Sequence, residues 1–260
     1  MPCYCYHSER IQLKIENKIA LITISREKQL NALNKSVLDN LSLTLDELNH
    51  NKMVRVLIIT GQGNKSFVAG ADIKEFQNFN NEEGKKLAQN GQHLVFDKIE
   101  NFSKPVIAAV NGYALGGGLE LAIACHIRVA SESAMLGFPE CSLGLIPGYG
   151  GTQRLGQLVG KGKAFEMILT GSMLKADQAE RIGLINKVCP DQCVLDDAEK
   201  IAKSCIKNSP KALTAAIKCI NNSYSKEGFE SEKTEFSKLF NTDEFTEGVA
   251  AFLEKRRPNY

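Results

Sequence analysis

Apolar and polar residues alternate at the start of the chain. Ile11, Leu13 and Ile15 form one alternating run, and residues 19–24 form a second one after the short polar stretch 16–18. A period of two residues is typical of a strand with one buried face, and so short a connection joins neighbouring strands as a hairpin. The chain is therefore predicted to begin with a two-stranded hairpin.

The spacing of apolar residues then changes to three and four. Residues 33–48 follow this helical period, which predicts a helix that ends near residue 50 and buries one stripe. Residues 54–60 are rich in β-branched side chains and too few for a buried helix, so they predict a buried strand. A polar helix around 82–101 and a second buried strand at 106–110 repeat the order. This repetition predicts a layered α/β core made of similar units.

Strand patterns end after about Asp191, and the remaining sequence has the pattern of helices. Pro210 suits the first turn of a helix. Gly228 and Gly248 are expected to interrupt helices, because glycine weakens a helix interior. A small helical domain is therefore predicted at the C-terminal end.

The composition argues against several classes of protein. With 260 residues, 43% of them hydrophobic and 24% charged, the chain has the balance of a globular protein with one main core. Its 32 basic and 30 acidic side chains give a formal charge of +2, so no basic field is available to hold a nucleic acid. No apolar run approaches the roughly 20 residues that span a bilayer, and the N-terminal residues lack the pattern of a secretory signal. We therefore expect a cytoplasmic protein that binds neither nucleic acid nor membranes.

The cysteines and histidines indicate neither disulfides nor a metal. The eight cysteines are scattered along a chain of ordinary size, which favours reduced thiols. Cys3, Cys5 and His7, and separately Cys189 with Cys193, lack the paired spacing of a zinc site, so no metal is expected. The four histidines stand apart from any obvious nucleophile, which gives no support to a hydrolase triad.

The first of three stretches rich in small residues is 66–74. Ala69, Gly70 and Ala71 precede a helix start expected near Asp72, which leaves main-chain N–H groups able to donate to a ligand oxygen. The alternative is an ordinary helix start with Asp72 as its cap. The sequence alone leaves both interpretations open.

The second stretch, 111–120, contains three successive glycines followed by Glu120. The glycines would open a helix whose first N–H groups attract negative charge. Glu120, three residues after Gly117, would lie over the same helix end. Alternatively, the glycines only allow a helix to pack against a strand, and Glu120 is an N3 capping residue.

The third stretch, 138–152, begins near a carboxylate and continues as a loop dense in proline and glycine. Glu140 precedes that loop, and a second glycine-opened helix is expected from about Thr152. Taken alone, Glu140 has the alternative of a solvated loop charge, because most glutamates are exposed.

Two glycine motifs for nucleotides are absent. Residues 61–66 end in Lys-Ser, but Asn64 precedes the lysine where a phosphate-binding P-loop has glycine. Leu121 stands where a dinucleotide fingerprint that starts at Gly116 needs its third glycine. Neither ATP nor NAD is indicated, and no cofactor is expected.

In combination, the three stretches resemble the enoyl-coenzyme A hydratase (crotonase) family. The motifs occur in the family's order and at its distances, and they are residues 69–74, 116–120, 139–140 and 146–154, with 248–257 similar to its terminal helix. The resemblance implies an α/β fold of the crotonase type, which is a spiral of repeated ββα units. It further implies that residues 1–195 form the core with the active site, and that residues 196–260 form the helical trimerisation domain of a homohexamer, a dimer of trimers.

By the same resemblance, the N–H groups of Ala71 and Gly117 form an oxyanion hole, and Glu120 and Glu140 are the two catalytic carboxylates. Gly148 lines the site for water and the acyl group. Contacts to the coenzyme A substrate are implied for Lys28, Ala69, Gly70, Asp72, Ile73, Lys74, Gly116, Pro139 and Gly148. The family commonly has proline after the arginine that matches Arg26, whereas this chain has Glu27, which would place a negative charge near the nucleotide.

The activity that the resemblance implies is hydration of trans-2-enoyl-coenzyme A to 3-hydroxyacyl-coenzyme A, a lyase reaction of fatty-acid β-oxidation. Glu120 would activate water and Glu140 would protonate C2 in a syn addition, with coenzyme A as part of the substrate rather than a cofactor. Family members that only isomerise or cleave tend to lack one of these carboxylates, so the pair favours hydration. The alternatives are a Δ3,Δ2-enoyl-coenzyme A isomerase, a branched-chain enoyl-coenzyme A hydratase and a non-catalytic RNA-associated scaffold, against which the lack of a basic cluster speaks.

Overall fold

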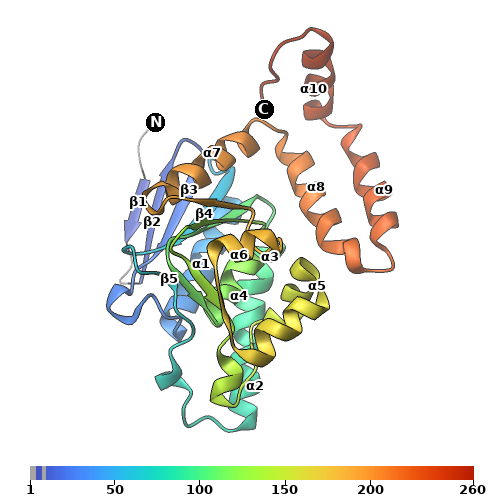
Figure 1. Ribbon diagram of the computed structural model, residues 1–260. Helices are drawn as coiled ribbons and strands as arrows, with labels where there is room; N and C mark the ends of the chain where they lie inside the picture. Colours follow the sequence, from blue (N-terminus) through green and yellow to red (C-terminus); the bar gives the residue numbers. More distant parts are fainter. Residues whose placement is uncertain (1–3, 8–9) are drawn as a thin grey trace.

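Two sheets form the centre of the protein in the computed structural model, which describes residues 4–7 and 10–260 and the side chains from residue 10 onward (Figure 1). The side chains of Cys3, Cys5 and His7 lie outside the described part. The larger sheet has seven strands, which in spatial order are β1 Tyr4–His7, β2 Ile11–Glu16, β3 Ile19–Ile24, β4 Val56–Gly61, β6 Val106–Val110, β8 Ile127–Ser131 and β11 Lys187–Cys189.

The chain opens with the predicted hairpin. Strands β2 and β3 pair antiparallel, with Glu16 opposite Ile19. The two residues between them, Asn17 and Lys18, have φ values of 51° and 66°. Positive φ at both central residues is what a type I′ turn needs, and this turn matches the twist of the strands that it joins.

The remaining pairs of the larger sheet are parallel from β3 to β11. The smaller sheet has the order β10 Met173–Lys175, β9 Met135–Gly137, β7 Tyr113–Leu115 and β5 Ser66–Val68. A long strand, a short strand and a helix follow one another three times along the chain, as β4, β5 and α2, then β6, β7 and α4, then β8, β9 and α5. This order confirms the predicted spiral of ββα units.

The helices at 35–50, 81–100, 117–124 and 151–170 fall where the apolar spacing and the glycines predicted them. The α-helices of the described residues are α1 Lys35–His50, α2 Asn81–Gly91, α3 Asp97–Glu100, α4 Gly117–Ala124, α5 Gly151–Thr170, α6 Ala176–Arg181, α7 Val194–Ile206, α8 Pro210–Asn221, α9 Gly228–Leu239 and α10 Asp243–Leu253. The Asn34 side chain caps α1 by accepting from the Val37 N–H at 2.9 Å. The predicted helix over 82–101 is continuous but not uniform, because a π-helical turn, Gln92–Phe96, separates α2 from α3.

Apolar side chains cover both faces of the larger sheet. Strand β4 shows the division, because Leu57 and Ile59 belong to the core shared with α1 and the smaller sheet, whereas Val56 and Ile58 face the cluster beneath α7. A strand buried on both faces has the continuous apolar pattern seen here. Helix α7 therefore packs on the sheet, although most of it follows the boundary predicted at residue 195.

Helices α8, α9 and α10 extend away from the two sheets (Figure 1). Pro210 is the first residue of α8, as predicted. The break predicted at Gly228 is confirmed, because α9 begins there. The break predicted at Gly248 is wrong, because this glycine lies inside α10. A glycine costs an exposed helix only about 1 kcal/mol, and here a β-carbon would lie 2.5 Å from the Tyr260 hydroxyl, so Gly248 makes room for the chain end. Among the described residues, none of the helices is long and apolar enough to cross a membrane.

Candidate active site

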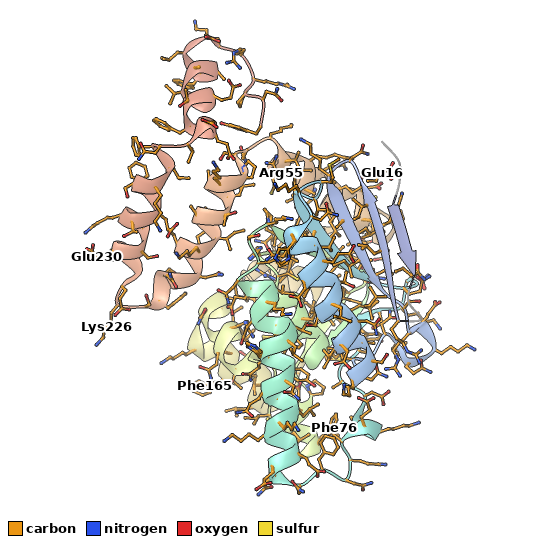
Figure 2. The ribbon with its side chains drawn as sticks, turned by 180° about the vertical axis from the view of Figure 1, so that it is seen from behind. Glu16, Arg55, Phe76, Phe165, Lys226 and Glu230 are labelled. Atoms are coloured by element: carbon orange, nitrogen blue, oxygen red, sulfur yellow. The ribbon has the colours of Figure 1, made fainter. Side chains whose placement is uncertain are left out.

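One cavity of about 810 Å³ lies where three parallel strands of the smaller sheet end. The carboxyl ends of parallel strands are a common place for ligand sites. Segments that follow β5, β7 and β9 form one side of the cavity, and α2 with the loop before it forms the other, where Phe76 lies (Figure 2). The predicted site residues that line the cavity are Ala69, Gly70, Ala71, Ile73, Gly116, Gly117, Glu120, Pro139, Glu140 and Gly148.

A parallel bridge fixes Ala71 beside Leu33. The Leu33 N–H donates to the Gly70 carbonyl at 2.8 Å, and the Asp72 N–H donates to the Leu33 carbonyl at 2.7 Å. Because these two bonds flank Ala71, its own N–H points away from Leu33. A β-carbon built on Gly117 would lie 3.6 Å from the Ala71 nitrogen. The two residues predicted to supply the donors therefore lie next to each other.

Glycines let α4 begin in contact with its neighbours. Gly116, the residue before the helix, has φ 50° and ψ −124°, and a β-carbon there would lie 2.6 Å from Glu140 Oε1. A β-carbon on Gly118 would collide with the Val68 carbonyl. Gly117 is the first helical residue, so the helix itself supplies no acceptor for its N–H. The glycines thus allow close packing and also leave a donor at the cavity.

The Glu120 side chain is fixed in the wall of the cavity. It is only 1% exposed, and its Oε1 accepts from the N–H groups of Tyr149 and Gly151, both at 2.7 Å. The alternative of an N3 capping residue is wrong, because these donors belong to the loop before α5 and to the first residue of α5, and no side chain caps α4. Burial raises the pKa of Glu120 to about 7, the two N–H donors oppose this rise, and the charge of Glu140 adds to it.

Glu140 approaches the same cavity from the 3₁₀ turn Glu140–Leu143 after β9. Its side chain is half-buried, and its Oε2 is buried without a hydrogen-bond partner among the described residues. Burial raises the pKa of Glu140 above its ordinary value. The alternative of a solvated loop charge is therefore wrong. An unpaired buried oxygen is unfavourable by itself, and it is available to a polar group that enters the cavity.

Asp72 has a different place from the one expected. The predicted helix is only a 3₁₀ turn, Ile73–Glu75, and the Asp72 side chain does not cap it. Its Oδ2 instead accepts from Arg26 Nη2 at 3.0 Å, while Arg26 Nη1 donates to the Ala32 carbonyl at 2.6 Å. Asp72 thus braces the loop that carries Ala71 and does not line the cavity.

The two lysines predicted to contact coenzyme A also lie outside the cavity lining. Lys28 belongs to the exposed 3₁₀ turn Glu27–Gln29, and Lys74 is an exposed neighbour of Ile73. Glu27 lies against Gly63, where a β-carbon would strike its carboxylate. The structure therefore does not bring the lysines together with the carboxylate pair.

The sequence-based prediction missed the residues that hold the loop around Gly148. Arg154 in α5 donates to the Tyr149 carbonyl, and Gln92 in the π turn donates to the Gly148 carbonyl. Burial raises the pKa of the Tyr149 phenol to about 12. Arg154 entered the sequence analysis only as part of the motif 146–154, which names no partner for it.

Apolar side chains line the rest of the cavity and were also missed. They come from the loop before α2, from α2 and from the loop before α5, and they are Phe76, Phe79, Leu87, Leu143, Leu145 and Ile146. Two phenylalanines three residues apart in a polar stretch were the available signal. These side chains suit a ligand with an apolar part.

The geometry supports proton transfer beside a bound carbonyl group. Two main-chain donors can stabilise the charge that develops on a carbonyl oxygen, and two carboxyl groups can take up and release protons beside it. Among the described side chains, no group of three His, Cys, Asp or Glu residues is placed to hold a metal ion. The cysteines from Cys125 onward are free thiols, as predicted for them.

Comparisons with known proteins agree over almost the whole chain. The family described as enoyl-CoA hydratase/isomerase matches residues 14–260. The short-chain-enoyl-CoA hydratase of Clostridium acetobutylicum is 44% identical over 250 residues, which covers 94% of this chain and 95% of that protein. The crotonyl-CoA hydratase of Syntrophomonas wolfei is 43% identical over 255 residues, which covers 97% and 98%.

A solved structure shares the fold as well. The crystal structure of enoyl-CoA hydratase from Bacillus anthracis superimposes with a TM-score of 0.91 at 38% identity. The match covers 96% of this chain and 98% of that one. The spiral architecture and the cavity at its strand ends are therefore set in a known fold.

Proposed function

This chain belongs to the enoyl-CoA hydratase/isomerase family, and we propose on that premise that it adds water across the double bond of a trans-2-enoyl-coenzyme A thioester. One observation carries the proposal: two carboxylates with raised pKa values line one cavity beside a pair of main-chain donors. The relatives named as hydratases support the same reaction, and they support its place in fatty-acid β-oxidation.

The thioester carbonyl would accept hydrogen bonds from the N–H groups of Ala71 and Gly117. Addition of hydroxide at C3 pushes negative charge through C2 onto this oxygen, so donors aimed at it stabilise the transition state. Each well-aimed donor contributes about 3 to 4 kcal/mol in comparable sites. The strand-like bridge at Ala71 and the helix start at Gly117 hold both donors before the substrate arrives.

The two carboxylates would flank one water molecule. Glu120 removes a proton from the water while the water oxygen attacks C3. Glu140 delivers a proton to C2 on the same face. Burial raises the pKa of each group, and the charge of Glu140 raises that of Glu120 further, which favours a single proton shared by the pair over two ionised carboxylates. This division of roles follows the family resemblance, and the fixed Oε1 of Glu120 and the unpaired Oε2 of Glu140 support it.

Coenzyme A would bind as part of the substrate, and no separate cofactor is required. The acyl group would enter the apolar end of the cavity beside Phe79 and Leu87. The coenzyme portion would leave past Ile73, with Lys74 and Lys28 as exposed cations able to meet its phosphates. The cytoplasmic location expected from the sequence stays a prediction.

We also propose that the protein assembles as a homohexamer, a dimer of trimers, through its C-terminal helices. The observation that supports this assembly is a set of large, exposed apolar side chains on these helices and the 3₁₀ turn between α8 and α9, namely Ile220, Tyr224, Phe229, Phe236, Phe240, Val249, Phe252 and Leu253. Exposed apolar surface on this scale usually marks a protein interface. Light scattering on the purified protein tests this assembly, and a monodisperse monomer would contradict it.

A substrate series tests the proposed reaction. Loss of the absorbance of the conjugated enoyl thioester is measured with trans-2-enoyl-coenzyme A substrates from C4 to C16, and 3-enoyl-coenzyme A is supplied separately. We expect hydration of crotonyl-coenzyme A to the 3-hydroxy product. Turnover of the 3-enoyl substrate alone would identify an isomerase, turnover restricted to branched chains would identify the branched-chain hydratase, and RNA binding without turnover would favour the scaffold.

A further inference from the structure

The loop that holds Glu120 is itself held by the helical segment 91–100. Gln92 Nε2 donates to the Gly148 carbonyl at 2.7 Å, and the Phe96 ring stacks on Tyr149 with centroids 4.7 Å apart and planes at 16°. Both residues lie in the π turn between α2 and α3. A π turn inserts an extra residue into a helix and changes the direction of its side chains, so the turn presents Gln92 and Phe96 to the loop.

Arg154 supplies a second connection between the same parts. It is only 7% exposed, and its Nη1 donates to the Tyr149 carbonyl at 2.8 Å. Its Nη2 donates to Asp97 Oδ1 and Glu100 Oε2, both at 2.7 Å. One guanidinium thus connects the loop before α5 to α3, where it forms ion pairs with two carboxylates.

Close packing leaves the loop little freedom. A β-carbon on Gly91 would collide with the Tyr149 ring, and one on Gly150 would collide with Arg154 Nη1. Gly150 also has φ 99°, a conformation that favours glycine. On the other side of the loop, the N–H groups of Tyr149 and Gly151 bind Glu120 Oε1. Arg154 and Gln92 therefore set where these two donors lie.

We propose that Arg154, assisted by Gln92, is a positioning residue for hydration, which fixes the loop 148–151 so that its N–H groups hold the Glu120 carboxylate toward the reacting water. The inference rests on the proposed function, because it assigns Arg154 a role in that same site. Arg154 does not line the cavity, so it acts through the loop and not by touching the substrate.

The proposal predicts a change in pH dependence as well as in rate. Several charged and titratable groups face Glu120 or the loop. They are Glu140 from the turn after β9, Tyr149 from the loop itself, Glu75 from the 3₁₀ turn Ile73–Glu75, Arg154 from α5, and Asp97 and Glu100 from α3 behind Arg154. The two N–H donors and the Arg154 charge lower the pKa of Glu120. Without Arg154 the donors lose their fixed position and the two α3 carboxylates lose their cation, so this pKa rises further.

The test compares the pH dependence of kcat and kcat/KM for the wild type, Arg154→Met and Arg154→Lys with crotonyl-coenzyme A. For Arg154→Met we expect kcat to fall about 10- to 100-fold, the loss typical of a misplaced catalytic group. KM should change little, and the acid limb should move up by about half a pH unit or more. Arg154→Lys keeps the charge and should return the limb toward its wild-type position. A folded Arg154→Met enzyme with the wild-type pH profile would overturn the proposal.

Arg128→Met provides a matched control. Arg128 is also a buried arginine that binds carbonyl groups, those of Leu184 and Cys125, but it does not line the cavity. Its loss should lower the thermal stability without moving the acid limb. An equal shift of the limb in Arg128→Met would show that general destabilisation explains the effect, and it would also overturn the proposal.

Gln92→Leu keeps the inference testable if Arg154→Met does not fold. This variant removes one neutral hydrogen bond to Gly148 and leaves the Arg154 cluster intact, so a smaller shift of the limb in the same direction is expected, and an unchanged profile contradicts the proposal. Wild-type turnover, measured in the same experiment, separates failure of the proposed function from failure of the positioning role of Arg154. Absence of any enoyl hydration by the wild type would refute the proposed function, and the carboxyl ¹³C titration of Glu120, assigned with Glu120→Gln, would still report whether Arg154 controls its pKa.

Discussion

The segments after β7 and β9, on the same side of the cavity, hold their carboxylates in different ways. Glu120 belongs to a buried helix, and two main-chain donors fix one of its oxygens. Glu140 belongs to a short turn, is half-buried, and keeps one buried oxygen without a partner. The fold therefore presets one acid completely and leaves the other with an unused bonding position.

This difference has a chemical meaning. A base that attacks through water benefits from a fixed orientation, because small displacements of a reacting group are expensive. A proton donor must be able to exchange its proton, and an unpaired oxygen allows that. The difference between the fixed Glu120 oxygen and the unpaired Glu140 oxygen supports the assignment of Glu120 to the water and Glu140 to C2.

Removal of either carboxylate should have the largest effect. Glu120→Gln and Glu140→Gln are each expected to lower turnover of crotonyl-coenzyme A by roughly 10² to 10⁴, the range for loss of a general acid or base. Folding should be little altered, as circular dichroism can check. Glu132→Gln, an exposed glutamate after β8, is the control. Near-normal hydration by either variant would remove that residue from the mechanism.

A change at Gly116 should displace Glu140. In Gly116→Ala a β-carbon would lie 2.6 Å from Glu140 Oε1, and alanine would have to adopt φ 50°. We expect kcat to fall about 10- to 100-fold because Glu140 is displaced. Gly156→Ala in α5, where a β-carbon meets nothing within 4 Å, should leave kcat unchanged. Equal kinetics for the two variants would show that Glu140 needs no such support.

The raised pKa of Glu120 should make the free energy of unfolding depend on pH. The pKa of Glu120 is raised to about 7 in the folded protein, so its contribution is intact below its ordinary pKa and is lost as the pH rises through about 7. Glu120→Gln should therefore be more stable than the wild type at pH 8, by on the order of 3 kcal/mol, with little difference at pH 4. Denaturant unfolding at both pH values measures this. A difference that does not depend on pH would contradict the raised pKa.

The smallest effect on catalysis is expected at Lys28, which does not line the cavity. Lys28 is an exposed cation, and we expect it to meet only a phosphate of the coenzyme portion. Lys28→Ala should therefore raise KM for crotonyl-coenzyme A about two- to fivefold, the loss of a weak exposed ion pair. The kcat value should not change, and the rise should shrink at high salt. A large loss of kcat would place Lys28 in the chemistry instead.

Much of the fold could be predicted from periodicity. The hairpin, the helix after it and the buried strands followed the two spacings of apolar residues, and Pro210 marked the start of α8. Local chemistry decides such features, so a single sequence carries them. Gly248 failed as a predicted break because its surroundings, not its own propensity, explain the glycine.

The site was predictable only in part. Small residues next to carboxylates left two interpretations open, and the family resemblance pointed to Ala71, Gly117, Glu120 and Glu140. All four line one cavity. The ion pair of Asp72 with a distant arginine and the contacts of Arg154 depend on residues far apart in the chain. No local pattern encodes such pairs, so the supporting network had to come from the structure.

The central claim is that both acids act on one face of the double bond through one water molecule. Hydration of crotonyl-coenzyme A in D₂O, followed by NMR of the 3-hydroxy product, tests it most directly. The account predicts a single deuterium at C2 on the same face as the new hydroxyl group. Deuterium on the opposite face, or an even mixture of both, would contradict it.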